Sequence, residues 1–136
     1  MPGIVTGLNH YTIRCAPGEL PALDDFYMRV IGLEKGRRPD IPAPGTWLYA
    51  GGVPIVHLYA ILDRVVEAGE PVTGPLDHIS FKGRDLEATK AHLRAQGVAF
   101  TQAPVPGWNI EQLFLRDPKG LKIELTFFLD EEGGRA

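Results

Sequence analysis

Apolar and polar residues alternate along most of the chain, and two stretches of helical spacing interrupt the alternation. Residues 8–14 alternate as a strand, and residues 20–31 then place apolar side chains at helical spacing until Gly32, a residue typical of helix ends. The same order of elements begins again near residue 76. The pattern predicts helices at 20–31 and 85–96, and strands at 8–14, 33–38, 46–50, 53–59, 76–82, 98–103, 110–115 and 120–128.

This order reflects an internal repeat. Two pairs of segments align, TGLNHYTI with TGPLDHISF (residues 6–13 and 73–81) and WLYAGGVPIVHL with FLRDPKGLKIEL (47–58 and 114–125). The members of each pair lie 67 or 68 residues apart. An offset that holds over half the chain indicates a duplicated unit.

Each repeat reads as strand–helix–strand–strand–strand, a βαβββ module. A module of about 65 residues buries too little surface to be stable comfortably by itself, so we expect the two modules to share one core. The predicted class is α+β. We expect one domain over residues 1–136, with module 1 at about 6–60, a connector at 61–75 and module 2 at about 76–129.

Composition excludes several classes of function. The net charge of −3 over 136 residues gives no reason to expect the basic patch that nucleic acid requires, and the apolar runs are too short to span a bilayer. The start, MPGIVTGLNH, lacks the basic and apolar regions of a secretory signal. Cys15 is the single cysteine and has no internal disulfide partner. We therefore expect a cytoplasmic protein.

Strand alternation places three histidines and one carboxylate on polar strand faces. His10 and His78 are repeat-equivalent, as are His57 and Glu124. One histidine on a strand is more often an ordinary hydrogen-bonded residue, but four residues at equivalent, same-face positions favour a shared site. If a pseudo-twofold axis relates the modules, these side chains converge. Two or three imidazoles and a carboxylate bind divalent metals, and an open face of two histidines and one carboxylate is typical of non-haem Fe(II).

The chain resembles the vicinal oxygen chelate superfamily, which includes glyoxalase I, extradiol dioxygenases and bleomycin resistance proteins. LNHYTIR, FYMRVIGLE, LDHISF and DPKGLKIEL carry the resemblance. It implies paired βαβββ modules that form an incomplete eight-stranded barrel around a divalent metal. It also implies that His10, His78 and Glu124 are metal ligands. The expected metal is Fe(II), with Zn(II), Ni(II) or Mn(II) as alternatives.

Position 57 separates the reactions known in this superfamily. Extradiol dioxygenases carry an acid/base histidine on the corresponding strand, whereas glyoxalase I carries a glutamate there. His57 therefore favours ring cleavage as the leading hypothesis, although Phe114 stands where these dioxygenases place a tyrosine. Arg14 matches an arginine that glyoxalase I uses toward glutathione, so a glyoxalase-type lyase or isomerase is the alternative.

The remaining expectations concern ligands and partners. Tyr59 shares a strand face with His57 and is the aromatic residue we expect in a substrate pocket, together with Arg14. The expected substrate is a small molecule with two adjacent oxygens, and the expected assembly is a homodimer. A drug- or metabolite-sequestering protein is the alternative outside enzymes, but such relatives have commonly lost the ligand residues that this chain retains.

Overall fold

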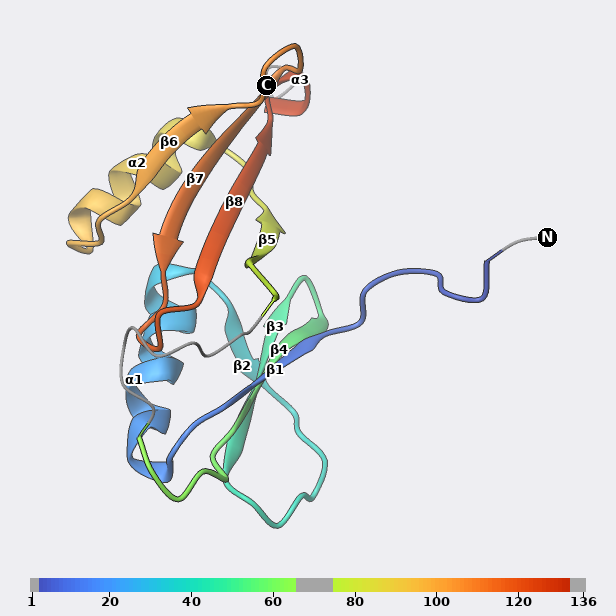
Figure 1. Ribbon diagram of the computed structural model, residues 1–136, viewed down its shortest axis with the longest axis vertical. Helices are drawn as coiled ribbons and strands as arrows, with labels where there is room; N and C mark the ends of the chain where they lie inside the picture. Colours follow the sequence, from blue (N-terminus) through green and yellow to red (C-terminus); the bar gives the residue numbers. More distant parts are fainter. Residues whose placement is uncertain (1–2, 66–74, 133–136) are drawn as a thin grey trace. The chain divides into compact units, whose positions relative to one another are not determined.

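The computed structural model describes residues 3–65 and 75–132. The chain divides into two compact units, Met1–Val65 and Val66–Ala136, and each unit holds one copy of the repeat (Figure 1). Most of the predicted connector lies outside the described residues. The prediction that both modules form a single domain therefore stays a prediction.

The first unit is a four-stranded mixed sheet in the order β1-β4-β3-β2. Strand β1 is parallel to β4, and the other neighbouring strands are antiparallel. Gly51 and Gly52, with φ of 55° and 84°, form the tight turn between β3 and β4. The elements of the first unit are β1 (Tyr11–Arg14), η1 (Pro17–Glu19), α1 (Leu20–Asp25), η2 (Phe26–Val30), β2 (Glu34–Gly36), β3 (Gly45–Ala50) and β4 (Val53–Tyr59).

The second unit repeats this topology with the order β5-β8-β7-β6, again with a parallel first pair. Asp85 caps the start of the main helix by accepting a hydrogen bond from the backbone N–H of Ala88 at 3.1 Å. The elements are β5 (His78–Lys82), α2 (Leu86–Ala95), β6 (Thr101–Pro104), β7 (Ile110–Arg116), β8 (Lys122–Phe128) and α3 (Leu129–Glu132).

The predicted α+β class and the two βαβββ modules are confirmed, and every predicted strand is present, most with adjusted ends. The prediction of one helix at 20–31 was too simple. The chain there forms a 3₁₀ turn, an α-helical turn and a π-helical turn in succession. Within the described residues, no helix is both long and apolar enough to cross a membrane.

In each unit, apolar side chains of the sheet and of the helix are buried. In the first unit, Leu23 of α1 and Leu48 of β3 are fully buried; in the second unit, Leu93 of α2 and Ile123 of β8 are fully buried. Because side chains alternate along a strand, the opposite face of each sheet receives the polar residues between them. That face carries the predicted site residues.

The turn between β7 and β8 is stabilised by a buried carboxylate. Asp117 is 4% exposed, and its Oδ1 accepts hydrogen bonds from the backbone N–H groups of Lys119 at 2.8 Å and Leu121 at 2.9 Å. Its carbonyl also accepts from the N–H of Gly120, which has a φ of 86°. This turn sets the register of β8, the strand that carries Glu124.

Replacing Asp117 with alanine should lower the free energy of unfolding by about 1–3 kcal/mol, because two buried N–H groups lose their acceptor. Urea unfolding followed by circular dichroism measures the change. Asp117→Asn keeps a side-chain oxygen as the acceptor and should lose less stability. Wild-type stability in the alanine variant would show that the carboxylate is not needed for the turn.

Candidate metal and substrate site

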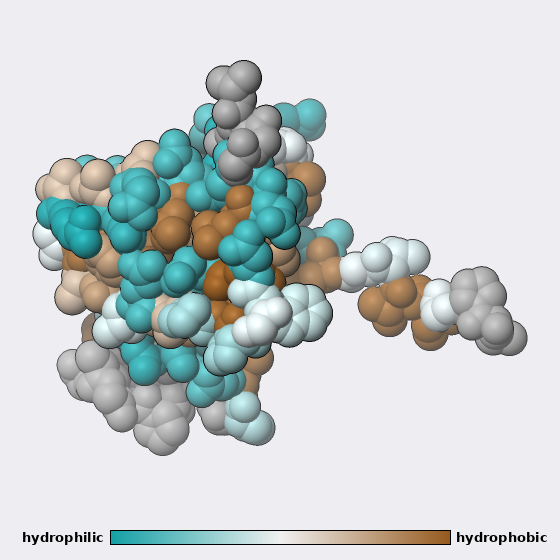
Figure 2. All heavy atoms as spheres, turned by 90° about the horizontal axis from the view of Figure 1, so that it is seen from above, coloured by the Kyte–Doolittle hydropathy of each residue, from teal (hydrophilic) through white to brown (hydrophobic). Residues whose placement is uncertain are grey.

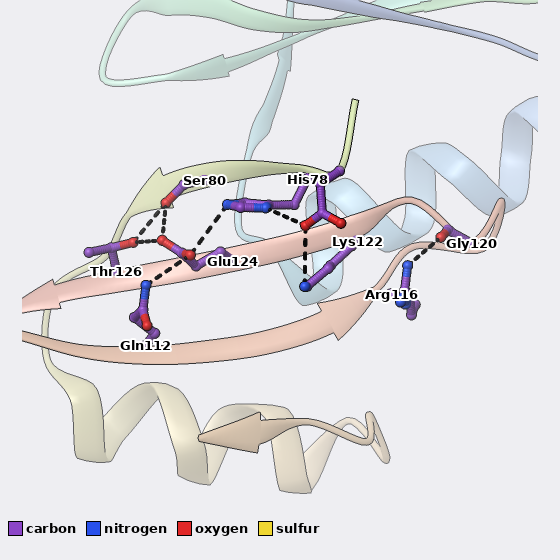
Figure 3. Close-up of polar contacts among 9 residues, drawn as sticks. His78, Ser80, Gln112, Arg116, Gly120, Lys122, Glu124 and Thr126 are labelled. Carbon is purple, nitrogen blue, oxygen red and sulfur yellow. Dashed lines mark hydrogen bonds and ion pairs between the residues drawn. The ribbon is translucent and has the colours of Figure 1, made fainter. Parts of the chain in front are cut away.

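His78 and Glu124 form one half of the predicted ligand set. They lie on the neighbouring parallel strands β5 and β8, where Ser80 is the register partner of Glu124. His78 Nε2 is 3.4 Å from Glu124 Oε1 (Figure 3). The structure thus brings one predicted imidazole and the predicted carboxylate together on the polar face of the second sheet.

Hydrogen bonds fix the carboxylate of Glu124, which is 7% exposed. Ser80 Oγ donates to Oε2 at 2.7 Å, Gln112 Nε2 donates to Oε1 at 3.0 Å, and Thr126 Oγ1 donates to Oε2 (Figure 3). Burial, the largest single influence, raises the pKa of Glu124. The three donors and nearby His78 together outweigh burial and bring the pKa below its ordinary value of 4.5. Glu124 is therefore anionic at neutral pH, as a metal ligand must be.

His10, the third predicted ligand, lies beside His57, the predicted acid/base, and their rings are stacked. The ring centroids lie 3.8 Å apart with an angle of 14° between the planes. Trp47, the β3 neighbour of His57, stacks on the same imidazole at 3.9 Å and 11°. Two rings this close cannot share one face of an imidazole, so His57 lies between His10 and Trp47.

His57 is held as a neutral imidazole. Its Nε2 lies 3.0 Å from the carbonyl oxygen of Pro54, which can only accept, so this nitrogen carries the proton and Nδ1 carries the lone pair. Burial is the main cause that lowers the pKa of His57 below its ordinary value of 6.5. The neighbouring His10 and Arg38 lower the pKa further, and the bond to Pro54 opposes them. A neutral ring with a free nitrogen can accept a proton.

A residue that the sequence interpretation passed over precedes each predicted histidine ligand. Asn9 Oδ1 is 2.7 Å from His10 Nδ1, and Asp77 Oδ2 is 2.8 Å from His78 Nδ1. Both oxygens can accept a hydrogen bond from Nδ1–H, which leaves Nε2 of each ring as the nitrogen that can bind a metal. Metal-binding histidines are commonly oriented in this way. The signal was visible in the echoes LNH and LDH, which repeat an Asn or Asp before the histidine.

The donor chemistry of these residues fits a divalent metal. Two Nε2 lone pairs and one fixed carboxylate are available, from His10, His78 and Glu124. The two pairs belong to different units, and residues 3–65 and 75–132 contain no group of three or more His, Cys, Asp or Glu side chains that could hold a metal. Convergence of His10, His78 and Glu124 on one metal ion therefore stays a prediction.

The predicted substrate residues lie near His57 in the first unit. Arg14 of β1 and Tyr59 of β4 are register partners, two residues beyond the Thr12–His57 pair. Arg14 is exposed and Tyr59 is half-buried. Both residues are therefore on the polar face near His57, and their contact with a substrate stays a prediction.

Phe114 lies beside Glu124 in the second unit. It is the β7 register partner of Glu124 and the repeat equivalent of Trp47. Lys122 Nζ lies 5.2 Å from the centroid of the Phe114 ring. An open cavity of about 590 Å³ is lined by Val98, Ala99, Phe100, Thr101, Phe114, Leu115, Arg116 and Lys122. The second unit thus places apolar and cationic side chains together close to Glu124.

Comparison with known proteins identifies the family of the chain. Residues 7–125 match the Glyoxalase/Bleomycin resistance protein/Dioxygenase superfamily. The protein Glyoxylase I 4 of Arabidopsis thaliana is 30% identical over 125 residues, which cover 89% of this chain and 70% of the relative.

Solved structures share the fold at lower identity. A glyoxalase family protein from Bacillus anthracis has a TM-score of 0.75 at 21% identity, with 94% of this chain and 99% of that chain covered. Lactoylglutathione lyase from Agrobacterium tumefaciens has a TM-score of 0.67 at 18% identity, with 92% and 96% covered. The repeat, the topology and the sequence match lead to one conclusion: the chain belongs to the Glyoxalase/Bleomycin resistance protein/Dioxygenase superfamily.

Proposed function

We propose that this protein is a divalent-metal-dependent enzyme that acts on a small substrate with two adjacent oxygen atoms. His10, His78 and Glu124 are the proposed ligands. The observation that carries the proposal is that hydrogen bonds orient all three side chains in a way suited to metal binding. Each histidine has its Nδ1 engaged by a neighbouring oxygen, and Glu124 is anionic within three hydrogen bonds.

A bound divalent metal would supply Lewis acidity that stabilises negative charge on two adjacent substrate oxygens. The chain's own residues supply the rest of the chemistry. Glu124 contributes a fixed negative charge, and the two histidines contribute imidazole nitrogen ligands. His57 is the proposed base, because its Nδ1 carries the lone pair and is available to take a substrate proton.

The reaction we propose first is extradiol ring cleavage of a catechol with Fe(II) and oxygen. Its support is the set of two histidines and one carboxylate, combined with a histidine at position 57. Phe114 departs from the tyrosine of such dioxygenases and offers no hydroxyl group to the substrate. A catechol bearing an acidic group would suit the exposed cationic side chain of Arg14.

A glyoxalase-type lyase or isomerase is the second candidate. Its specific support is the 30% identity to Glyoxylase I 4, together with the exposed Arg14 beside Tyr59. This reaction would use Zn(II), Ni(II) or Mn(II) in place of Fe(II). A binding protein that sequesters a drug or metabolite is the candidate outside enzymes, and metal content separates it from the first two.

Elemental analysis of protein purified without added metal tests the proposal. Iron, with oxygen uptake on a panel of catechols, supports ring cleavage. Nickel, zinc or manganese, with isomerisation of the hemithioacetal of methylglyoxal and glutathione, replaces ring cleavage with the second candidate. Failure to bind any of these metals under any loading condition overturns the proposal of a metal-dependent enzyme.

We also propose that the protein is a cytoplasmic homodimer. The fully buried thiol of Cys15 is compatible with a reducing compartment. The segment before β1 supports association, because Ile4, Val5 and Leu8 are 96%, 79% and 81% exposed, and apolar side chains are visible on the molecular surface in Figure 2. Strand β1 is also at an edge of its sheet, where a second chain can pair.

Sedimentation at micromolar concentration should give twice the mass of one 14.9 kDa chain. The double variant Ile4→Glu, Val5→Glu should shift the equilibrium toward the single chain, because burial of charged side chains is unfavourable. A wild-type mass of 14.9 kDa would contradict the homodimer.

A further inference from the structure

We infer that Asn9 and Asp77 are positioning residues that make the two histidine ligands unequal, with His78 the stronger metal ligand and His10 the weaker one. This inference rests on the proposed metal site. It goes beyond the choice of ligands, because it assigns a role to the residue before each histidine and explains why the two repeats differ there.

The two modules use the same geometry with different chemistry. The distance from the accepting oxygen to the imidazole Nδ1 is 2.7 Å for Asn9 and 2.8 Å for Asp77. In both modules the neighbouring residue engages Nδ1, so Nε2 is the nitrogen that can bind a metal; in the second module Nε2 of His78 also faces Glu124 Oε1, an atom of another proposed ligand, at 3.4 Å. The difference is charge, since Asn9 offers a neutral amide oxygen and Asp77 offers a carboxylate.

A carboxylate forms a stronger, charge-assisted hydrogen bond than an amide does. It therefore draws the Nδ1 proton more strongly and makes Nε2 of the same ring a better electron donor to a metal. Lys122 Nζ lies 3.3 Å from the same Asp77 oxygen, so this carboxylate contacts both His78 and Lys122. Among the described residues, the two contacts fix Asp77 although its side chain is 72% exposed.

Asparagine and aspartate have nearly the same shape, so exchanging them changes the charge and keeps the accepting oxygen. We expect Asp77→Asn to weaken binding of Zn(II), used as the probe metal, by about 10-fold, and Asp77→Ala by up to about 100-fold. Asn9→Asp should strengthen binding. Competition with a chromophoric chelator measures all three affinities, and Asp25→Asn is the charge control because Asp25 pairs with Arg29 on the surface.

A second measurement uses the metal-free protein. Nitrogen-15 spectra should show the Nδ1–H tautomer for His78 in the wild type and in Asp77→Asn, and a mixture of tautomers in Asp77→Ala. This readout does not depend on metal binding or activity. Failure of the wild type to bind metal would reject the proposed function, while the tautomer result would still decide whether Asp77 positions His78.

Any one of three results would overturn the inference. The first is wild-type affinity for Zn(II) in both Asp77→Asn and Asn9→Asp, and the second is a loss of affinity in Asp25→Asn as large as that in Asp77→Asn. The third is an unchanged His78 tautomer in Asp77→Ala. Opposite shifts in affinity for the two exchanged positions, with an unchanged Asp25→Asn control, would support it. Circular dichroism of each variant confirms that the comparison is made between folded proteins.

Discussion

Replacing Glu124 with alanine should lower the affinity for a divalent metal by more than about 100-fold. Loss of a residue that only orients a ligand typically costs about 10–100-fold, and Glu124 is proposed to bind the metal directly. It is also the sole anion among the three proposed ligands, so its loss removes the charge that a divalent ion requires. Chelator competition and elemental analysis of the purified variant measure the effect. His10→Ala and His78→Ala should weaken binding in the same direction.

The control must separate loss of a ligand from loss of fold. Glu124→Ala removes the carboxylate that accepts from Ser80, Gln112 and Thr126, so some loss of stability is expected. Glu124→Gln retains an accepting oxygen and nearly the same shape, and should still bind metal poorly. Glu111→Gln removes the same charge from the neighbouring strand β7 and should bind metal normally. Wild-type affinity in Glu124→Gln would remove Glu124 from the ligand set.

The fold could be predicted because local patterns and the repeat agreed. Gly32 and Gly97 were expected to end the helices, and both adopt a positive φ, 90° and 70°. The alternation at residues 53–59 matches the observed β4 without adjustment. Where two repeats carry the same signal, a weak pattern in one is supported by the other.

Other elements depend on contacts that no local pattern contains. The acidic residues of α3 look like a solvated tail in sequence, but they bind distant partners. Glu131 Oε1 is 2.8 Å from Lys82 Nζ, and Glu132 Oε1 accepts from the backbone N–H of Leu86 at 2.9 Å. These contacts join positions more than 40 residues apart. The change from 3₁₀ to α to π geometry in the first helix also lacks a distinct sequence signal.

Part of the geometry of the candidate site could be predicted, whereas its role as a metal site stays a prediction. Strand alternation correctly placed His57 on a face with polar neighbours and placed Glu124 beside His78. It could not show that Trp47 stacks on His57, because that contact depends on the β3–β4 register, which shifts between Leu48 and Tyr49. Nor could it show the direction of the hydrogen bonds to each imidazole, which requires side-chain geometry.

Replacing His57 with alanine should lower turnover by about 10²–10⁴-fold, the usual contribution of general acid–base catalysis, while metal affinity changes much less. The reason is the position of the single N–H proton on the neutral imidazole ring. Nε2 is bound to the Pro54 carbonyl oxygen, so Nδ1 of the neutral ring is free to accept a proton. Turnover is measured with the substrate that the wild type converts, and metal content is measured on the same samples.

Alanine also removes the ring between His10 and Trp47, so a matched variant is needed to isolate the chemistry. His57→Phe keeps an aromatic ring in the stack and removes both nitrogens. If His57 is the base, the phenylalanine and alanine variants should lose turnover to a similar extent and retain most of their metal. Near-normal turnover in His57→Phe would show that the stack, rather than a proton transfer, is what position 57 contributes. Metal loss as severe as in His78→Ala would instead make His57 a fourth ligand, which would favour glyoxalase-type coordination over the proposed ring cleavage.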